Sequence, residues 1–157
     1  MRSDMEKIVR EYIEKSPHMS LGTSLNNKPW VCELNFVFDD QLNLYFRSLE
    51  SRRHSQEIAE NPNVAGNIVA QHTPDESVHG VYFEGTAVII EDDNKRQKLL
   101  PLFQSRLGTD ESIIEEARTA DGHQFYKVTV ESWFAFGDFG DGSIDKYQLV
   151  WNGGTEQ

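Results

Sequence analysis

The sequence predicts an α+β fold, mainly β, in which an antiparallel barrel is flanked by helices. Short segments rich in β-branched and aromatic residues follow one another and are joined by tight turns of Gly, Asn, Asp and Pro. Strands connected in this way pair antiparallel, and about seven of them close most easily into a barrel. Helical segments interrupt the strands, and 157 residues suit a single domain spanning 1–157.

A helix opens the chain, and three strands are expected after it. Ser3 is placed to cap the helix with Glu6 at the capping-box spacing, and Pro17 is expected to end it. Polar and apolar residues partly alternate in WVCELNFVF, which suits a strand with one face toward a core and the other toward a site. The three strands are predicted at 19–25, 30–38 and 42–46.

Further along, helices and strands alternate in blocks. Ser51 is the expected cap of a second helix that Pro62 bounds, and Pro101 is expected to kink or split a third. A short fourth helix is expected to begin at a Thr or Asp cap, and a glycine-rich turn over 138–143 joins the last two strands. Helices are predicted at 51–61, 91–108 and 109–118, and strands at 63–70, 78–90, 124–137 and 145–151.

Composition excludes several classes of function. The net charge of −11 and a pI near 4.8 disfavour nucleic acid and anionic membranes as partners. No apolar run approaches the roughly 18–20 residues that cross a bilayer, and the charged N-terminus does not resemble a signal peptide, so a cytoplasmic protein is expected. The single Cys32 is expected to line a core or a site, and the five histidines show no metal-ligand spacing, so no metal is expected.

A basic corner stands out in this acidic chain. Arg47, Arg52 and Arg53 lie where a predicted strand leads into the helix that Ser51 caps. A helix N-terminus that also offers a hydroxyl group and arginine guanidinium groups can bind a phosphate. The alternative is a solvated patch whose arginines pair with nearby acids (Glu50, Glu57 and Glu60). His54 either contacts the same phosphate or lies exposed on the helix.

The run LYFRSLESRRHSQEIAENPNV, residues 44–64, resembles the pyridoxamine 5′-phosphate oxidase-like flavoproteins. In that family a strand ends in aromatics, a Ser-Arg-Lys triplet opens a helix, and Asn-Pro precedes the next strand. Here the triplet is Ser51-Arg52-Arg53 and the dipeptide is Asn61-Pro62. The resemblance extends back through residues 21–40 and forward to VYFEGTAVI, and so covers roughly the first 90 residues.

The resemblance implies an FMN-binding split β-barrel, a homodimer with FMN at the subunit interface. Arg52 and Arg53, which follow Ser51, take the places of the phosphate-binding Arg and Lys. By the same resemblance, Trp133 of one subunit either lines the flavin site of the neighbouring subunit or belongs to the core or the dimer interface. The other matching positions are the strand end that contacts the cofactor (Phe46 and Arg47) and the middle of the strand whose backbone follows the flavin (Glu33, Leu34 and Asn35).

Departures from the family pattern argue against pyridoxamine-phosphate oxidation. Val31 and Phe36 stand where the oxidases have an Arg and a Lys, and Gly80 replaces a Gln that faces the flavin. Two hypotheses therefore remain. One is an FMN-dependent oxidoreductase acting on an unknown small molecule, with no catalytic side chain identified. The other is a non-catalytic module that binds flavin, deazaflavin or haem on the same barrel.

Overall fold

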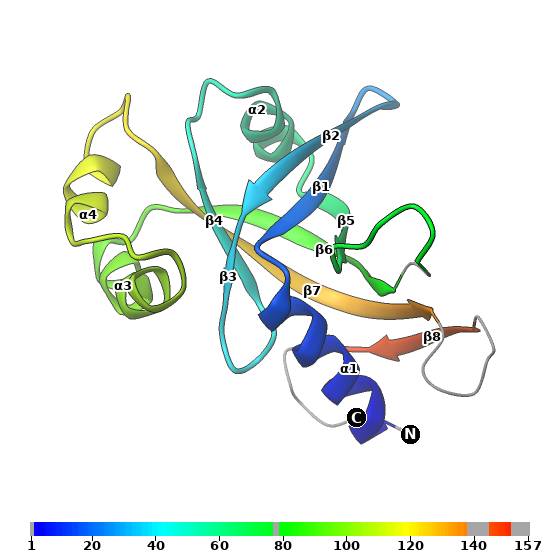
Figure 1. The fold of residues 1–157 in the computed structure, drawn as a ribbon. Coiled ribbons are helices and arrows are strands. Elements are labelled where there is room, and N and C mark those ends of the chain that lie inside the picture. Colours follow the sequence, from blue (N-terminus) through cyan, green and yellow to red (C-terminus); the bar gives the residue numbers. More distant parts are fainter. Residues whose placement is uncertain (1, 77–78, 138–144, 152–157) are drawn as a thin grey trace.

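The computed structural model describes residues 2–76, 79–137 and 145–151, with no account of side chains at 2, 3 and 145–147. Its eight strands form one antiparallel sheet in the order β2-β1-β5-β6-β7-β4-β3, and β8 pairs with β7. The sheet curls into a partly open barrel with helices around it, as Figure 1 shows. The predicted fold class is therefore confirmed. The strands are β1 (His18–Leu25), β2 (Lys28–Asn35), β3 (Val37–Phe38), β4 (Leu44–Ser48), β5 (Asn63–Val69), β6 (Gly80–Ile90), β7 (Gln124–Gly137) and β8 (Asp145–Val150).

One predicted strand is in fact two. The stretch 30–38 breaks at Phe36, because the chain changes neighbours there: β2 pairs with β1 up to Asn35, and β3 pairs with β4 from Val37. Phe36 itself is fully buried. The break carries the chain from one end of the sheet to the other, and this crossing brings β2 close to β4.

The helices are α1 (Arg2–Lys15), α2 (Arg53–Glu60), α3 (Asp93–Leu107) and α4 (Ser112–Ala117). α1 already includes Ser3, so the expected capping box does not mark its start, although it ends before Pro17 as predicted. α2 has Arg52 at its N-cap because residues 49–52 first form a turn, in which the Arg52 N–H donates to the Leu49 carbonyl. α3 runs unbroken through Pro101, and the predicted turn at 138–143 lies outside the described residues.

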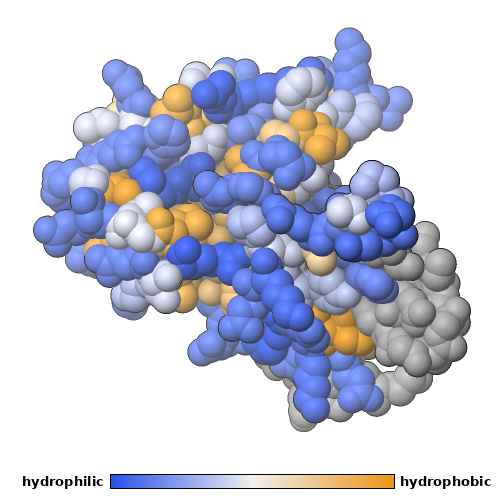
Figure 2. Space-filling model, in the orientation of Figure 1, coloured by the Kyte–Doolittle hydropathy of each residue, from blue (hydrophilic) through white to orange (hydrophobic). Residues whose placement is uncertain are grey.

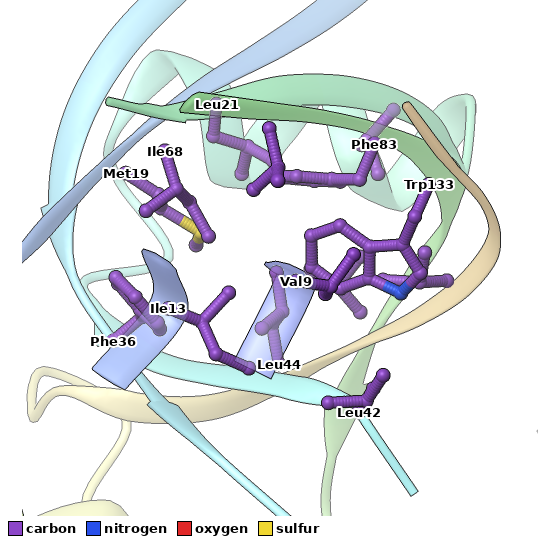
Figure 3. Packing of buried hydrophobic residues seen from close by; sticks show 14 of the residues in the cluster. Val9, Ile13, Met19, Leu21, Phe36, Leu42, Leu44, Ile68, Phe83 and Trp133 are labelled. Atoms are coloured by element: carbon purple, nitrogen blue, oxygen red, sulfur yellow. The ribbon is translucent and has the colours of Figure 1, made fainter. Parts of the chain in front are cut away.

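Two apolar cores lie on the two faces of the sheet. The inner core fills the barrel, and α1 covers it by inserting Val9 and Ile13 toward Phe36, Leu44 and Trp133 (Figure 3).

The outer core lies beneath α3 and α4 and is built around Phe103, Phe125, Ile113 and Ile114. Hydrophilic side chains dominate the face seen in Figure 2, as expected for so charged a chain.

Arg106, at the end of α3, ties three distant segments together. Its Nε donates to the Phe36 carbonyl at 2.8 Å, and its Nη groups donate to the carbonyls of Ile13, Glu14 and Ser16 at the end of α1. The guanidinium lies over the Phe36 ring, 4.5 Å from its centroid. Arg106 therefore satisfies carbonyls that a helix end leaves without intrahelical partners.

Candidate cofactor site

The split in the barrel leaves one edge of β2 without a strand. Among the described residues β2 pairs with β1 alone, so its other edge presents backbone N–H and C=O groups. Trp30 is 41% exposed and Val31 is 63% exposed beside this edge. Glu33 and Asn35 point outward, where Glu33 accepts a hydrogen bond from Ser20, whereas Leu34 is half-buried against the inner core. The edge thus combines backbone polarity with apolar surface.

The end of β4 lies across the split, but its two predicted cofactor residues face into the fold. Phe46 is fully buried and stacks on Tyr126, with 5.0 Å between ring centroids. Arg47 donates from Nη2 to Glu116 of α4 at 2.6 Å and lies over the Phe125 ring. Arg47 therefore holds α4 against the sheet.

The start of α2 has the features of an anion site. Arg52 makes no side-chain capping bond, and the first turn of this described helix holds no acidic residue. The backbone N–H groups and the positive end of the helix dipole are thus not neutralised from within the helix. Ser51 and Arg52 are both exposed at this corner. A phosphate dianion is the kind of ligand that such an arrangement favours.

Arg53 is held in place between α2 and β2. Its guanidinium lies 4.3 Å from the centroid of the Trp30 ring, and its Nε donates to Glu57 at 2.7 Å. The Glu57 carboxylate is buried, and its other oxygen accepts from the Thr23 hydroxyl at 3.0 Å. Hydrogen bonding from Arg53 lowers the pKa of Glu57, so the acid stays ionised and fixes the arginine beside the β2 edge.

The sequence suggested Glu57 only as a surface partner of the arginines, and it gave no signal for Trp30. Both residues matter because they orient Arg53 toward the split. The separation of Glu57 from Arg53 by four residues is the one local sign of their ion pair. The stacking on Trp30 joins residues that are distant in sequence, so only the fold reveals it.

His54 is neither exposed nor on the ligand side of α2. It is 7% exposed, packs toward the Phe46 ring, and forms a hydrogen bond through Nε2 with the Ser48 hydroxyl at 2.8 Å. Burial, and then the positive charge of Arg52, lower the pKa of His54. The neutral imidazole therefore ties the start of α2 to the end of β4.

We expect this imidazole to make the protein less stable in mild acid. The unfolded chain protonates His54 near pH 6.5, whereas the folded chain does so only at a lower pH. The unfolded state thus binds more protons as the pH falls below about 6.5, and stability falls with it. In urea unfolding between about pH 7.5 and 5, His54→Gln should lose stability less steeply than the parent. His72→Gln, at an exposed histidine, is the matched control, and equal slopes for parent and His54→Gln would contradict the assignment.

Trp133 and Cys32 do not join the corner. Trp133 is fully buried inside the barrel and packs on Phe83, because it faces inward on β7; its indole N–H has no hydrogen-bond partner there. The Cys32 thiol faces the inner core from β2, and burial raises its pKa to about 11. A thiol with this pKa stays protonated near neutral pH and is a poor nucleophile.

Gly80 is explained by packing. A Cβ atom there would lie 2.8 Å from the Ile68 carbonyl oxygen and 3.1 Å from the Val69 Cα. A glutamine therefore does not fit at this position without a shift of the backbone. Among the described residues no group of three or more His, Cys, Asp or Glu side chains is placed to hold a metal ion. No helix in the described ranges is long and apolar enough to cross a membrane.

A curled antiparallel sheet that is open along one edge of β2, with helices around it, defines the class of split β-barrel proteins. The sequence matches the pyridoxamine 5′-phosphate oxidase family over residues 5–137, and the chain belongs to this family. It is not pyridoxamine 5′-phosphate oxidase itself, since Val31, Phe36 and Gly80 replace family residues.

Relatives support the same family. The chain is 24% identical over 91 residues to a UPF0306 protein of Photorhabdus laumondii and 32% identical over 82 residues to one of Pasteurella multocida. These matches cover 57% and 52% of this chain and only 64% and 55% of the two curated relatives.

Among solved structures, Campylobacter jejuni ChuZ has a TM-score of 0.75 at 17% identity, covering 94% of this chain and 60% of that one. A heme binding protein from Mycobacterium smegmatis has a TM-score of 0.67 at 16% identity, covering 89% and 56%. At these identities the likeness concerns the fold.

Proposed function

We propose that this protein binds FMN and acts as a flavin-dependent oxidoreductase on a small molecule. The observation that carries the proposal is the uncapped start of α2, where Arg52 and the fixed Arg53 lie beside the free edge of β2. A dianionic phosphate fits this corner by charge and by the available N–H groups. Family membership supports the same cofactor.

The chain's own residues would divide the binding among them. Arg52 and Arg53 would hold the phosphate, and the β2 backbone from Glu33 to Asn35 would offer hydrogen bonds along the ring system. Val31 and Phe36 add no charge, so the phosphate is held by fewer cations than in the oxidases. Bound flavin would supply hydride or electron transfer, and the protein would supply binding, orientation and exclusion of water.

The absorbance spectrum of freshly purified protein tests this proposal. We expect a yellow protein with an absorbance band at about 450 nm, and denaturation should release a compound with the mass of FMN. A Soret band would instead favour haem, which the likeness to a heme binding protein keeps as the second candidate. A released mass matching a deazaflavin would keep the barrel site but change its cofactor. A colourless protein that does not bind added FMN would contradict the proposal.

We also propose that two copies of the chain meet at the split and complete the site between them. The exposed apolar side chains of Trp30 and Val31 on an unpaired strand edge favour such contact. Light scattering should give about twice the 18.0 kDa of one chain. In FMN-free protein, Val31→Lys should raise the dimer dissociation constant by roughly tenfold or more, because a buried charge with no phosphate beside it costs several kcal/mol. Val150→Lys, at an exposed valine of β8, should leave it unchanged.

A further inference from the structure

A cavity lies on the side of α2 that faces away from Arg53. Its volume is about 670 Å³, and it is formed by α2, by Glu50 and Pro62 on either side of that helix, by the last part of β6 and by Tyr126 of β7. At 100° per residue, Ser55, Ile58 and Ala59 project from the side of α2 opposite Arg53 and Glu57. The cavity therefore uses a different side of α2 from Arg53, although Glu50 at its rim directly precedes Ser51 of the phosphate corner.

The wall of this cavity includes a strand edge. β5 begins at Asn63, opposite Thr86, and the Ala87 N–H donates to the Pro62 carbonyl. Beyond that point none of the described strands pairs with β6 on this side, whereas β7 continues to pair on the other. The backbone after Ala87 thus borders the cavity with polar groups between apolar side chains, among them Val88 and Ile89.

The polar side chains of the cavity carry a distinctive charge pattern. The Ser55 hydroxyl is buried and has no hydrogen bond of standard geometry. It lies close to the Tyr126 hydroxyl, whose pKa is raised by burial and lowered by Ser55. Glu50 is the one charged group among the lining residues, and none of them is Lys, Arg or His. A phosphate or carboxylate would therefore meet no cation here and would be repelled by Glu50.

We propose that this cavity binds a neutral, largely apolar aromatic molecule that carries a hydrogen-bond donor. Ile58, Val88 and Ile89 would cover its rings, and the Ser55 oxygen or the Glu50 carboxylate would accept its donor. Small-molecule sites occupy about 300–1,000 Å³, so the volume is appropriate. The inference does not depend on flavin binding, because none of the residues proposed to hold FMN lines this cavity.

Two probes with the same ring system test the charge preference. N-phenyl-1-naphthylamine is neutral with one N–H donor, and 8-anilino-1-naphthalenesulfonate adds a negative charge. We expect saturable fluorescence enhancement by the neutral probe at one site per chain, and at least about tenfold weaker binding of the anionic probe. Equal affinity for both probes would overturn the proposal.

Filling the cavity tests its location. Ala59→Trp and Gln56→Trp alter exposed lining positions on α2, so both variants should fold, as circular dichroism and thermal unfolding will show. Each should weaken binding of the neutral probe by at least tenfold. Ala120→Trp, at an exposed alanine away from the cavity, should not change it. If the folded α2 variants bind the probe like the parent, the site is elsewhere and the proposal fails, whatever the result of an FMN titration.

Discussion

Replacing Arg52 and Arg53 together by alanine should weaken FMN binding by about 2–4 kcal/mol, or roughly 30- to 1,000-fold. Each charge-assisted hydrogen bond to a phosphate is worth about 1.5–3 kcal/mol, and the two arginines share one ligand, so their contributions are not fully additive. Fluorescence or calorimetric titration of apoprotein with FMN measures the change. Arg52 is exposed, but Arg53 is the partner of the buried Glu57 carboxylate, so thermal unfolding of the double variant accompanies the titration.

The matched control is the double variant Arg10→Ala with Arg118→Ala, which removes the same total charge elsewhere. Arg10 pairs with Glu6 and Arg118 pairs with Asp93, and both pairs are solvent-accessible. If FMN affinity fell equally in both double variants, the effect would come from overall charge and not from the corner. Unchanged affinity in the Arg52 and Arg53 variant would remove these residues from the cofactor site.

Arg106→Ala should destabilise the fold by about 3 kcal/mol or more. The substitution removes four hydrogen bonds to carbonyls and the contact with the Phe36 ring, and it leaves the end of α1 without its partner. Urea unfolding measures the loss as a shift in midpoint at constant slope. Arg106→Lys keeps the charge but not the planar guanidinium group, so its loss of stability should lie between those of the parent and Arg106→Ala.

Arg10→Ala provides the comparison for a partly exposed arginine and should cost within about 1 kcal/mol. A loss of less than about 0.5 kcal/mol for Arg106→Ala would show that the three segments hold together without it.

Local patterns were enough to predict most of the barrel. Turn residues and strand-like runs gave the order of the elements, and the left-handed backbone of Asn26 and Asn27 in the β1–β2 hairpin is the kind of turn that such residues allow. The basic corner was also visible, because three arginines in a short acidic stretch need no tertiary information.

What the sequence missed depends on contacts between distant residues. Phe36 ends β2 because the chain there crosses to β4, and Arg47 forms an ion pair with Glu116, 69 positions later. For Trp133 the sequence allows the flavin site, the dimer interface or the core, and Trp133 lies in the inner core because its position on β7 faces inward. Alternation along one strand does not reveal which face meets the barrel interior.

The position of α1 over the inner core has a consequence for the order of folding. α1 is the first helix of the chain, yet the strands that it contacts, β5 to β8, all come later. During synthesis its apolar stripe with Val9 and Ile13 stays partly uncovered until β7 and β8 emerge and the sheet curls. Such long-range closure is slow compared with hairpin formation, so this apolar segment makes the nascent chain prone to aggregation during synthesis.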